Sequence, residues 1–78
     1  MTDERPMTEG EYRVGVSFNP SGSSQVNDIK QKIADLIDDL NGIASDRNHP
    51  GARWAAIAMT ELESAAMWAV KAVTKQAR

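Results

Sequence analysis

Residues 50–78 carry two separate sets of apolar side chains at helical spacing, although a helix in a two-helix hairpin needs only one. The stretch reads PGARWAAIAMTELESAAMWAVKAVTKQAR. One set repeats at alternating intervals of four and three residues, as a helix-packing seam does: Ala55, Met59, Leu62, Ala66, Ala69 and Val73. The other set comprises Trp54, Ile57, Ala65, Trp68 and Ala72. The first set predicts the core of a hairpin, and the second predicts an additional contact surface.

Two interpretations of the second surface remain open. Trp54 and Trp68 are fourteen residues apart, so two heptads return them to nearly the same side of the helix. The indoles either cover the flank of the hairpin and contact the N-terminal segment, or they are buried against neighbouring copies. Chain length favours burial of the indoles against neighbouring copies, because 78 residues without cysteine bury a small core and have no disulfide to compensate. We therefore expect an all-α protein that assembles into a symmetric homo-oligomer.

A first helix is predicted from about residue 24 to 45. Its apolar residues recur at intervals of three and four, and they are Val26, Ile29, Ile33, Leu36 or Ile37, Leu40 and Ile43. Ser23 and Ser24 are candidates for its N-cap. The second helix is predicted from about residue 50 to 77, with Pro50 at its start. Because the connection is short and polar, the two helices are expected to form an antiparallel hairpin.

The N-terminal part is predicted to be non-helical. Residues 1–11 are polar and acidic, and we expect a mobile arm there. In residues 12–22 apolar and polar side chains alternate before a turn rich in Pro, Ser and Gly, which predicts an extended segment laid over the helices. The hairpin domain then comprises residues 12–78. Neither a signal peptide nor a stretch of ~20 apolar residues is recognisable, so a cytoplasmic protein without a membrane contact is expected.

Several function classes find no support in the composition. Cysteine is absent and His49 is the single histidine, and the acidic residues Asp28, Asp35, Asp38 and Asp39 are interpreted as a solvated face, so no metal site is expected. No nucleophile triad, phosphate loop or dinucleotide fingerprint occurs, which argues against an enzyme and against a bound cofactor. Nine basic and eleven acidic residues give a net charge of -2, which disfavours binding to duplex nucleic acid.

Candidate ligand-binding residues gather where the N-terminal segment enters the first helix. Phe18 offers a stacking surface and Asn19 offers an amide that both donates and accepts hydrogen bonds. Lys30 is predicted to run its stem along the edge of the seam and to present its ammonium there. The backbone amides of the turn and the helix N-terminus suit an anion, so a nucleotide site is predicted. The alternatives are that Phe18 anchors the arm to the core, and that Lys30 and Lys71 are solvated surface lysines.

These residues lead to a resemblance. The segment FNPSG, followed by Val26 and the Ile29-Lys30 pair, occurs with a later helix reading PGARWAAIAMTELESAAMWAVKAVTK. This combination resembles the helical-hairpin domain shared by phage anti-defence sponges, namely the anti-CBASS cyclic-oligonucleotide sponge and the C-terminal part of the Thoeris anti-defence sponge. The resemblance covers about residues 12–76. Its most recognisable residues are Pro50, Arg53, Thr60, Leu62, Glu63 and the Met67-Trp68-Ala69 run.

The resemblance implies a protein that binds signalling nucleotides without cleaving them and so withholds the messenger of an antiphage effector. The ligands would be cyclic dinucleotides, cyclic trinucleotides or cyclic ADP-ribose isomers. Members act as symmetric oligomers, commonly hexamers, with pockets formed where protomers meet. If the chain is encoded by a phage, its place is the cytoplasm of the host cell.

The resemblance also implies roles for individual residues. Phe18 would stack on bases, beside Asn19 and Pro20 of the same motif, and Lys30 would meet phosphate. Lys71 matches a basic residue late in the second helix. Arg53 matches the motif as well, and it either contacts ligand or pairs with an acidic residue across the hairpin. Phenylalanine replaces the tyrosine of some members, and Lys71 replaces an arginine and so loses its bidentate geometry.

Two other classes stay open. One is a helical hairpin that docks on a larger protein through its second face and binds no nucleotide. The other is a small DNA-associated regulator, in which the basic residues would have to share one face: Arg13, Lys30, Lys32, Arg53 and Lys71. The helical positions of Lys30 and Lys32 lie on opposite edges of the seam, which disfavours this second class.

Overall fold

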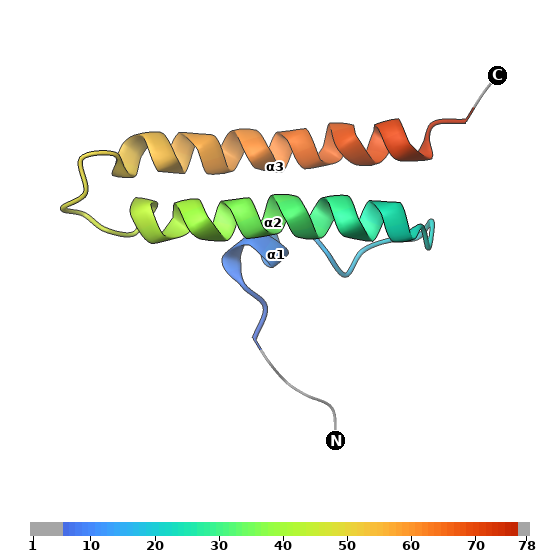
Figure 1. Ribbon diagram of the computed structural model, residues 1–78, viewed down its shortest axis with the longest axis horizontal. Coiled ribbons are helices and arrows are strands. Elements are labelled where there is room, and N and C mark those ends of the chain that lie inside the picture. The colour runs from blue at the N-terminus through green and yellow to red at the C-terminus, as the bar shows by residue number, and fades with distance from the viewer. Residues whose placement is uncertain (1–5, 77–78) are drawn as a thin grey trace.

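The computed structural model describes residues 6–76 and contains three helices, with no strand in that range. Helix α1 spans Glu9–Val14, α2 spans Ser24–Ala44 and α3 spans Ala52–Thr74. Helices α2 and α3 lie side by side in opposite directions, and α1 packs mainly against α2 (Figure 1). The prediction of an all-α helical hairpin is confirmed.

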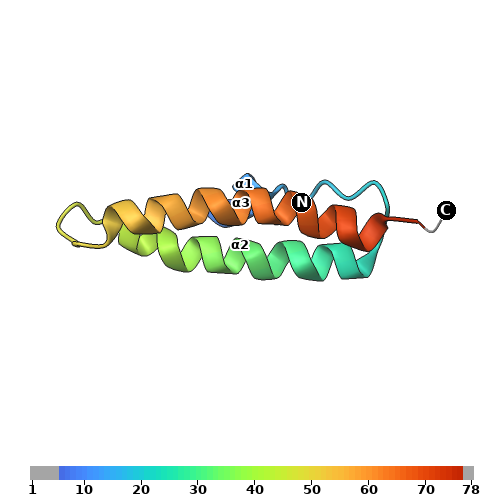
Figure 2. The same cartoon turned by 90° about the horizontal axis from the view of Figure 1, so that it is seen from above.

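The core of the hairpin follows the predicted seam on α3 and a shifted line on α2. Three members of the α3 seam are buried, and they are Ala55, Met59 and Ala66. On α2 the buried residues are Val26, Lys30, Ala34 and Ile37, whereas Ile29 and Ile33 are only partly buried. The shift arises because α2 is covered both by α3 and by α1 with the turn that follows it. Figure 2 shows α1 and this turn on one side of the hairpin, and no other described element on the opposite side.

Helix α1 lies where the sequence predicted first a mobile arm and then an extended segment. The hydroxyl of Thr8 accepts a hydrogen bond from the Glu11 amide at 3.1 Å, and the Glu11 carboxylate accepts one from the Thr8 amide at 3.0 Å. This capping box starts the helix, and Gly15 ends it in the left-handed conformation (φ 72°). Residues 9–11 are therefore helical instead of part of a mobile arm, and residues 12–14 are helical instead of extended. Residues 1–5 of the expected arm lie outside the described range.

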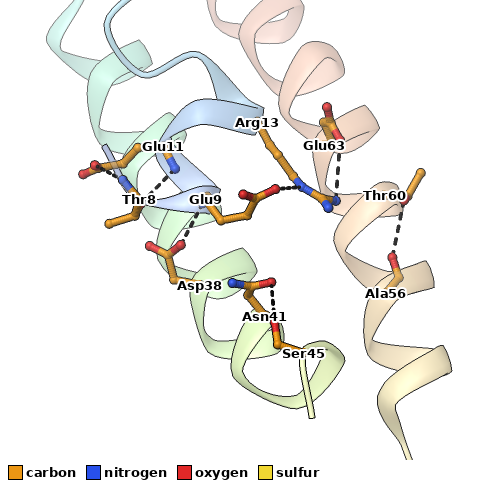
Figure 3. Close-up of polar contacts among 11 residues, drawn as sticks. Thr8, Glu9, Glu11, Arg13, Asp38, Asn41, Ser45, Ala56, Thr60 and Glu63 are labelled. Atoms are coloured by element: carbon orange, nitrogen blue, oxygen red, sulfur yellow. Dashed lines mark hydrogen bonds and ion pairs between the residues drawn. The ribbon is translucent and has the colours of Figure 1, made fainter. Parts of the chain in front are cut away.

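Close approach of backbones fixes α1 to α2. A Cβ atom at Gly10 would lie 2.0 Å from the carbonyl oxygen of Ala34, so only glycine fits there. The Gly10 amide donates to Oδ1 of Asp38 at 2.7 Å. Asp38 is thus a half-buried acceptor for α1, which differs from the solvated role predicted for it. On the other side of α1, Nη1 of Arg13 lies 3.9 Å from Oε1 of Glu63 on α3 (Figure 3).

The ends of the long helices agree with some of the predicted caps. Ser23 is the N-cap of α2, and its hydroxyl accepts a hydrogen bond from the Val26 amide at 3.3 Å. Pro50 lies in the connecting turn, because α3 begins at Ala52 with Gly51 as its N-cap. The Gly51 amide donates to Nδ1 of His49, which closes this turn. Helix α3 ends at Thr74 and Lys75 is extended, so the helix is shorter than predicted. No helix within the described residues is both long and apolar enough to cross a bilayer.

Candidate functional site

The side chain of Lys30 organises the turn between α1 and α2. It is only 6% exposed, and its Nζ donates to the carbonyl of Gly15 at 3.0 Å and to the carbonyl of Phe18. The sequence placed this ammonium at the edge of the seam, but the turn folds back over α2 and covers it. An ammonium has three N–H groups, and within residues 6–76 Lys30 has these two acceptors. One N–H donor therefore remains for another acceptor.

The ring of Phe18 points away from the core. It is 71% exposed, and its centroid lies 5.6 Å from Nζ of Lys30. This distance is within the range of a cation–π contact. The carbonyl group of Phe18 thus holds the turn to Lys30. The ring of Phe18 does not anchor the N-terminal arm to the core, which was one of the two alternatives. The exposed ring and the covered ammonium form an aromatic and cationic pair at one place.

The Asn19 amide is used inside the turn. Its Nδ2 donates to the carbonyl of Ser23 at 2.8 Å and to Oδ1 of Asn27 at 2.9 Å. Its Oδ1 accepts from the hydroxyl of Ser21 at 2.6 Å. A carbonyl oxygen can accept two hydrogen bonds, so Oδ1 has capacity for one more partner. Asn19 therefore shapes the turn, and only its oxygen could also contact a ligand.

Two hollows flank Phe18. The first has a volume of about 270 Å³ and is lined by residues 18–21 of the turn together with Val26, Lys30, Val70 and Thr74. The second has a volume of about 360 Å³ and extends past Val14, Ala66 and Met67. Both are lined by Phe18, Lys30 and Val70. The fold thus brings together four of the predicted site residues, and these are Phe18, Asn19, Pro20 and Lys30.

Val70 and Thr74 were missed by the sequence reasoning. They are four residues apart, so they share one face of α3 near its C-terminal end. In an antiparallel hairpin this end lies beside the start of α2, where Phe18 and Lys30 are found. The spacing of Val70 and Thr74 is a signal for a shared face of the helix. This stretch was assigned to the core from the sequence because Val73 beside them belongs to the predicted seam.

Arg53 and Lys71 line neither hollow. Arg53 lies in the first turn of α3, ~25 Å along the helix from Val70 by the rise per residue. Its guanidinium lies 5.4 Å from the ring of Trp54, and it forms no ion pair with a described residue. Nζ of Lys71 lies 5.5 Å from the ring of Trp68. Each of these basic residues therefore lies over an indole of its own helix.

The second apolar face of α3 is uncovered by residues 6–76. Trp54 is 65% exposed and Trp68 is 63% exposed, and Ile57 between them is exposed as well. Most of each indole is therefore left uncovered by the hairpin and by the N-terminal segment within the described range. This face, with Arg53 and Lys71 beside its indoles, is available for another molecule.

No group of three or more histidine or acidic side chains gathers within residues 6–76 in a way that could hold a metal ion. Glu63 lies 3.9 Å from Arg13, and the two glutamates of α3, Glu61 and Glu63, are two residues apart and so lie on different sides of the helix. The arrangement can stack an aromatic group, donate to an anion and accept apolar surface.

Comparison with known families gives a match that covers most of the chain. Residues 10–74 match the family described as Acb2/Tad1, hairpin domain. The range includes both long helices and begins inside α1, so the docked α1 belongs to the matched region. No curated protein and no solved structure matches significantly.

Proposed function

This chain belongs to the Acb2/Tad1 hairpin-domain family of phage cyclic-nucleotide sponge anti-defence proteins, and we propose on that premise that it binds and sequesters cyclic oligonucleotide immune messengers. The ligand is held without being cleaved, and the antiphage effector is deprived of its activator. One observation supports the ligand class most directly. The exposed ring of Phe18 lies next to the Lys30 ammonium, which has one N–H donor left, at the wall of two hollows.

The chemistry of this pair fits a nucleotide. A base can stack on the ring of Phe18, and such stacking contributes ~1–3 kcal/mol per base. A phosphate oxygen can accept from the third N–H of Lys30, and a hydrogen bond between two charged groups is short and strong. The N-terminus of α2 begins at Ser24, close in sequence to the turn, and its helix dipole adds positive potential on the same side.

A single copy does not enclose such a ligand. Pockets for small molecules typically enclose ~300–1,000 Å³ and bury most of the ligand, whereas the two hollows beside Phe18 are about 270 Å³ and 360 Å³ and both are partly open. A second copy related by two-fold symmetry would cover them and would supply a second Lys30 for the second phosphate of a cyclic dinucleotide. The exposed indoles of α3 provide the contact surface for this assembly, and the assembly implied by the family resemblance is a hexamer.

Assembly would also give Arg53 and Lys71 a way to reach a ligand. Both lie on exposed positions of α3 beside Trp54 and Trp68, away from the hollows of their own chain. If the indole-bearing face packs against neighbouring copies, these basic groups approach the sites of those copies. The location consistent with this function is the cytoplasm of the infected host cell.

The test is calorimetric titration of the purified protein with cyclic dinucleotides, cyclic trinucleotides and a cyclic ADP-ribose isomer, together with mass by light scattering. We expect tight binding of at least one ligand, which is recovered unaltered after denaturation. Phe18→Ala should weaken binding about 5- to 150-fold, the equivalent of one lost base stack. Tyr12→Ala is the matched control, because Tyr12 is a similarly exposed aromatic (74%) that lines neither hollow.

A different outcome identifies the competing function. An oligomer that binds no nucleotide of the panel, or equal affinities for Phe18→Ala and Tyr12→Ala, would contradict this site. A monomer or dimer without nucleotide affinity would favour a hairpin that docks on a larger protein through Trp54 and Trp68. The DNA-associated alternative loses support from the structure, because Lys30 is buried and cannot join an exposed basic face.

A further inference from the structure

We propose that helix α1 positions the nucleotide site. The docking of α1 through Gly10 and Asp38 holds the turn of residues 15–23, which carries Phe18, in place on the ammonium of Lys30. The inference rests on the proposed function for the identity of the ligand. Neither Gly10 nor Asp38 lines either hollow, so their effect would be indirect.

The first link is the docking of the N-terminal end of α1. The Gly10 amide donates to Oδ1 of Asp38 at 2.7 Å, a short hydrogen bond to a charged acceptor. The backbone of Gly10 lies so close to α2 that an added Cβ would be 2.0 Å from the Ala34 oxygen and 2.7 Å from its carbonyl carbon. Real Cβ atoms essentially never approach other atoms within 3.0 Å, so any larger residue at position 10 forces α1 away from α2 by about 1 Å.

The second link is the carbonyl group of Gly15 at the other end of α1. The helix holds this residue, because the Gly15 amide donates to the carbonyl of Glu11 at 3.0 Å. The Gly15 oxygen then accepts two hydrogen bonds, one from Nζ of Lys30 at 3.0 Å and one from the Phe18 amide at 3.0 Å. The carbonyl of Phe18 accepts from the same Nζ. Phe18 is therefore held at both backbone groups by a closed triangle with Gly15 and Lys30.

These links make the position of α1 decisive for the site. The hydrogen bond of 3.0 Å from Nζ of Lys30 to the Gly15 carbonyl does not survive a shift of about 1 Å, because the normal range of such bonds ends near 3.2 Å. Once the Gly15 carbonyl moves with α1, Lys30 loses this acceptor, and the turn that runs from Gly15 to Phe18 is no longer held to α2 at that point. The ammonium then becomes more accessible to water, and the ring loses its defined position over the hollows. Part of the binding free energy is then used to order the turn, which lowers the affinity for the ligand.

The experiment compares Gly10→Ala with Gly42→Ala, because a Cβ at Gly42 would meet no atom within 4 Å. The first readout needs no ligand. An amine-acylating reagent is applied to the folded proteins, and the rates at Lys30 and Lys32 are measured by peptide mass spectrometry. In the wild type and in Gly42→Ala, buried Lys30 should react much more slowly than exposed Lys32. In Gly10→Ala the rate at Lys30 should rise at least 5-fold, while the rate at Lys32 stays the same.

The second readout is the affinity for the tightest-binding nucleotide of the wild type, with circular dichroism to confirm that α2 and α3 are intact. Gly10→Ala should bind at least 10-fold more weakly than Gly42→Ala. Asp38→Ala should act in the same direction, and Asp38→Asn should restore much of the affinity because its side-chain oxygen still accepts from Gly10. If Gly10→Ala does not fold, the comparison of Asp38→Ala with Asp38→Asn decides the matter with the same two readouts.

The two proposals fail separately. A wild-type protein that binds no nucleotide would refute the sponge, while the labelling rates at Lys30 would still test the positioning role of α1. Unchanged protection of Lys30 in a folded Gly10→Ala variant would overturn the positioning role. So would a variant with an exposed Lys30 that binds nucleotide as tightly as Gly42→Ala.

Discussion

Replacement of Lys30 by alanine should cost the protein stability as well as ligand affinity. The structure gives this side chain two carbonyl acceptors in the turn and a ring contact, and it is almost completely buried. Lys30→Ala leaves the carbonyls of Gly15 and Phe18 without their donor and removes the aliphatic stem from the core. Replacement of a solvent-exposed lysine whose only role is to bind phosphate would not lower the stability of the protein.

The size of the effect follows from these contacts. Hydrogen bonds from a charged donor contribute ~1.5–3 kcal/mol each, but the ammonium regains its hydration when the protein unfolds, and the carbonyls of an opened turn can bind water. We therefore expect Lys30→Ala to lower the free energy of unfolding by about 2–4 kcal/mol. A domain of this length has a total stability of ~4–12 kcal/mol, so the variant should remain folded with a small margin.

The assay is urea denaturation followed by circular dichroism at a fixed protein concentration, since assembly makes apparent stability depend on concentration. The midpoint should fall by more than about 1 M urea. Lys32→Ala is the matched control, because Lys32 is exposed on the same helix and its loss should change stability by less than about 0.5 kcal/mol. The mass of the assembly should stay that of the wild type, because Lys30 faces the turn and not the indoles of α3. Equal midpoints for the two variants would refute the reasoning.

Three further outcomes follow from burial, exposure and capping. Met59→Ala should lower the free energy of unfolding by about 2–5 kcal/mol because Met59 is fully buried, whereas Met67→Ala at an exposed position should change it little; equal urea midpoints would contradict this. Changing Trp54 and Trp68 together to serine should reduce the mass measured by light scattering without loss of helix, and an unchanged mass would remove the indole face from the assembly. Ser23→Ala should cost about 0.5–2 kcal/mol in thermal or urea unfolding as a lost N-cap, and a neutral effect would show that the turn caps α2 by other groups.

Much of this fold is local and could be predicted from the sequence. The repeats of three and four residues predict both long helices, the short connection predicts their antiparallel pairing, and Ser23 is one of two predicted N-cap candidates. Such signals depend on residues that are close in sequence. The same applies to the exposed stripe of Trp54 and Trp68. The short helix at Glu9–Val14 was equally local, since Thr8 and Glu11 form a capping box. Two other signals compete with it: the polar, acidic composition of residues 1–11 predicts an arm, and the alternation from Tyr12 onward predicts extended chain.

The arrangement of atoms around the candidate site, unlike the helices, depends on contacts between segments that are distant in sequence. The sequence identified Phe18, Asn19 and Lys30 as a group, but the helical position of Lys30 predicted an ammonium at the seam edge. Its actual burial depends on a turn that folds back over α2, and this turn is held by α1, whose docking requires Gly10 to touch Ala34 across 24 residues of sequence. Contacts between distant segments have no periodic signal in a single chain. The tertiary structure alone therefore decided which atoms Lys30 bonds and where Phe18 points, because backbone contacts between packed helices determine both.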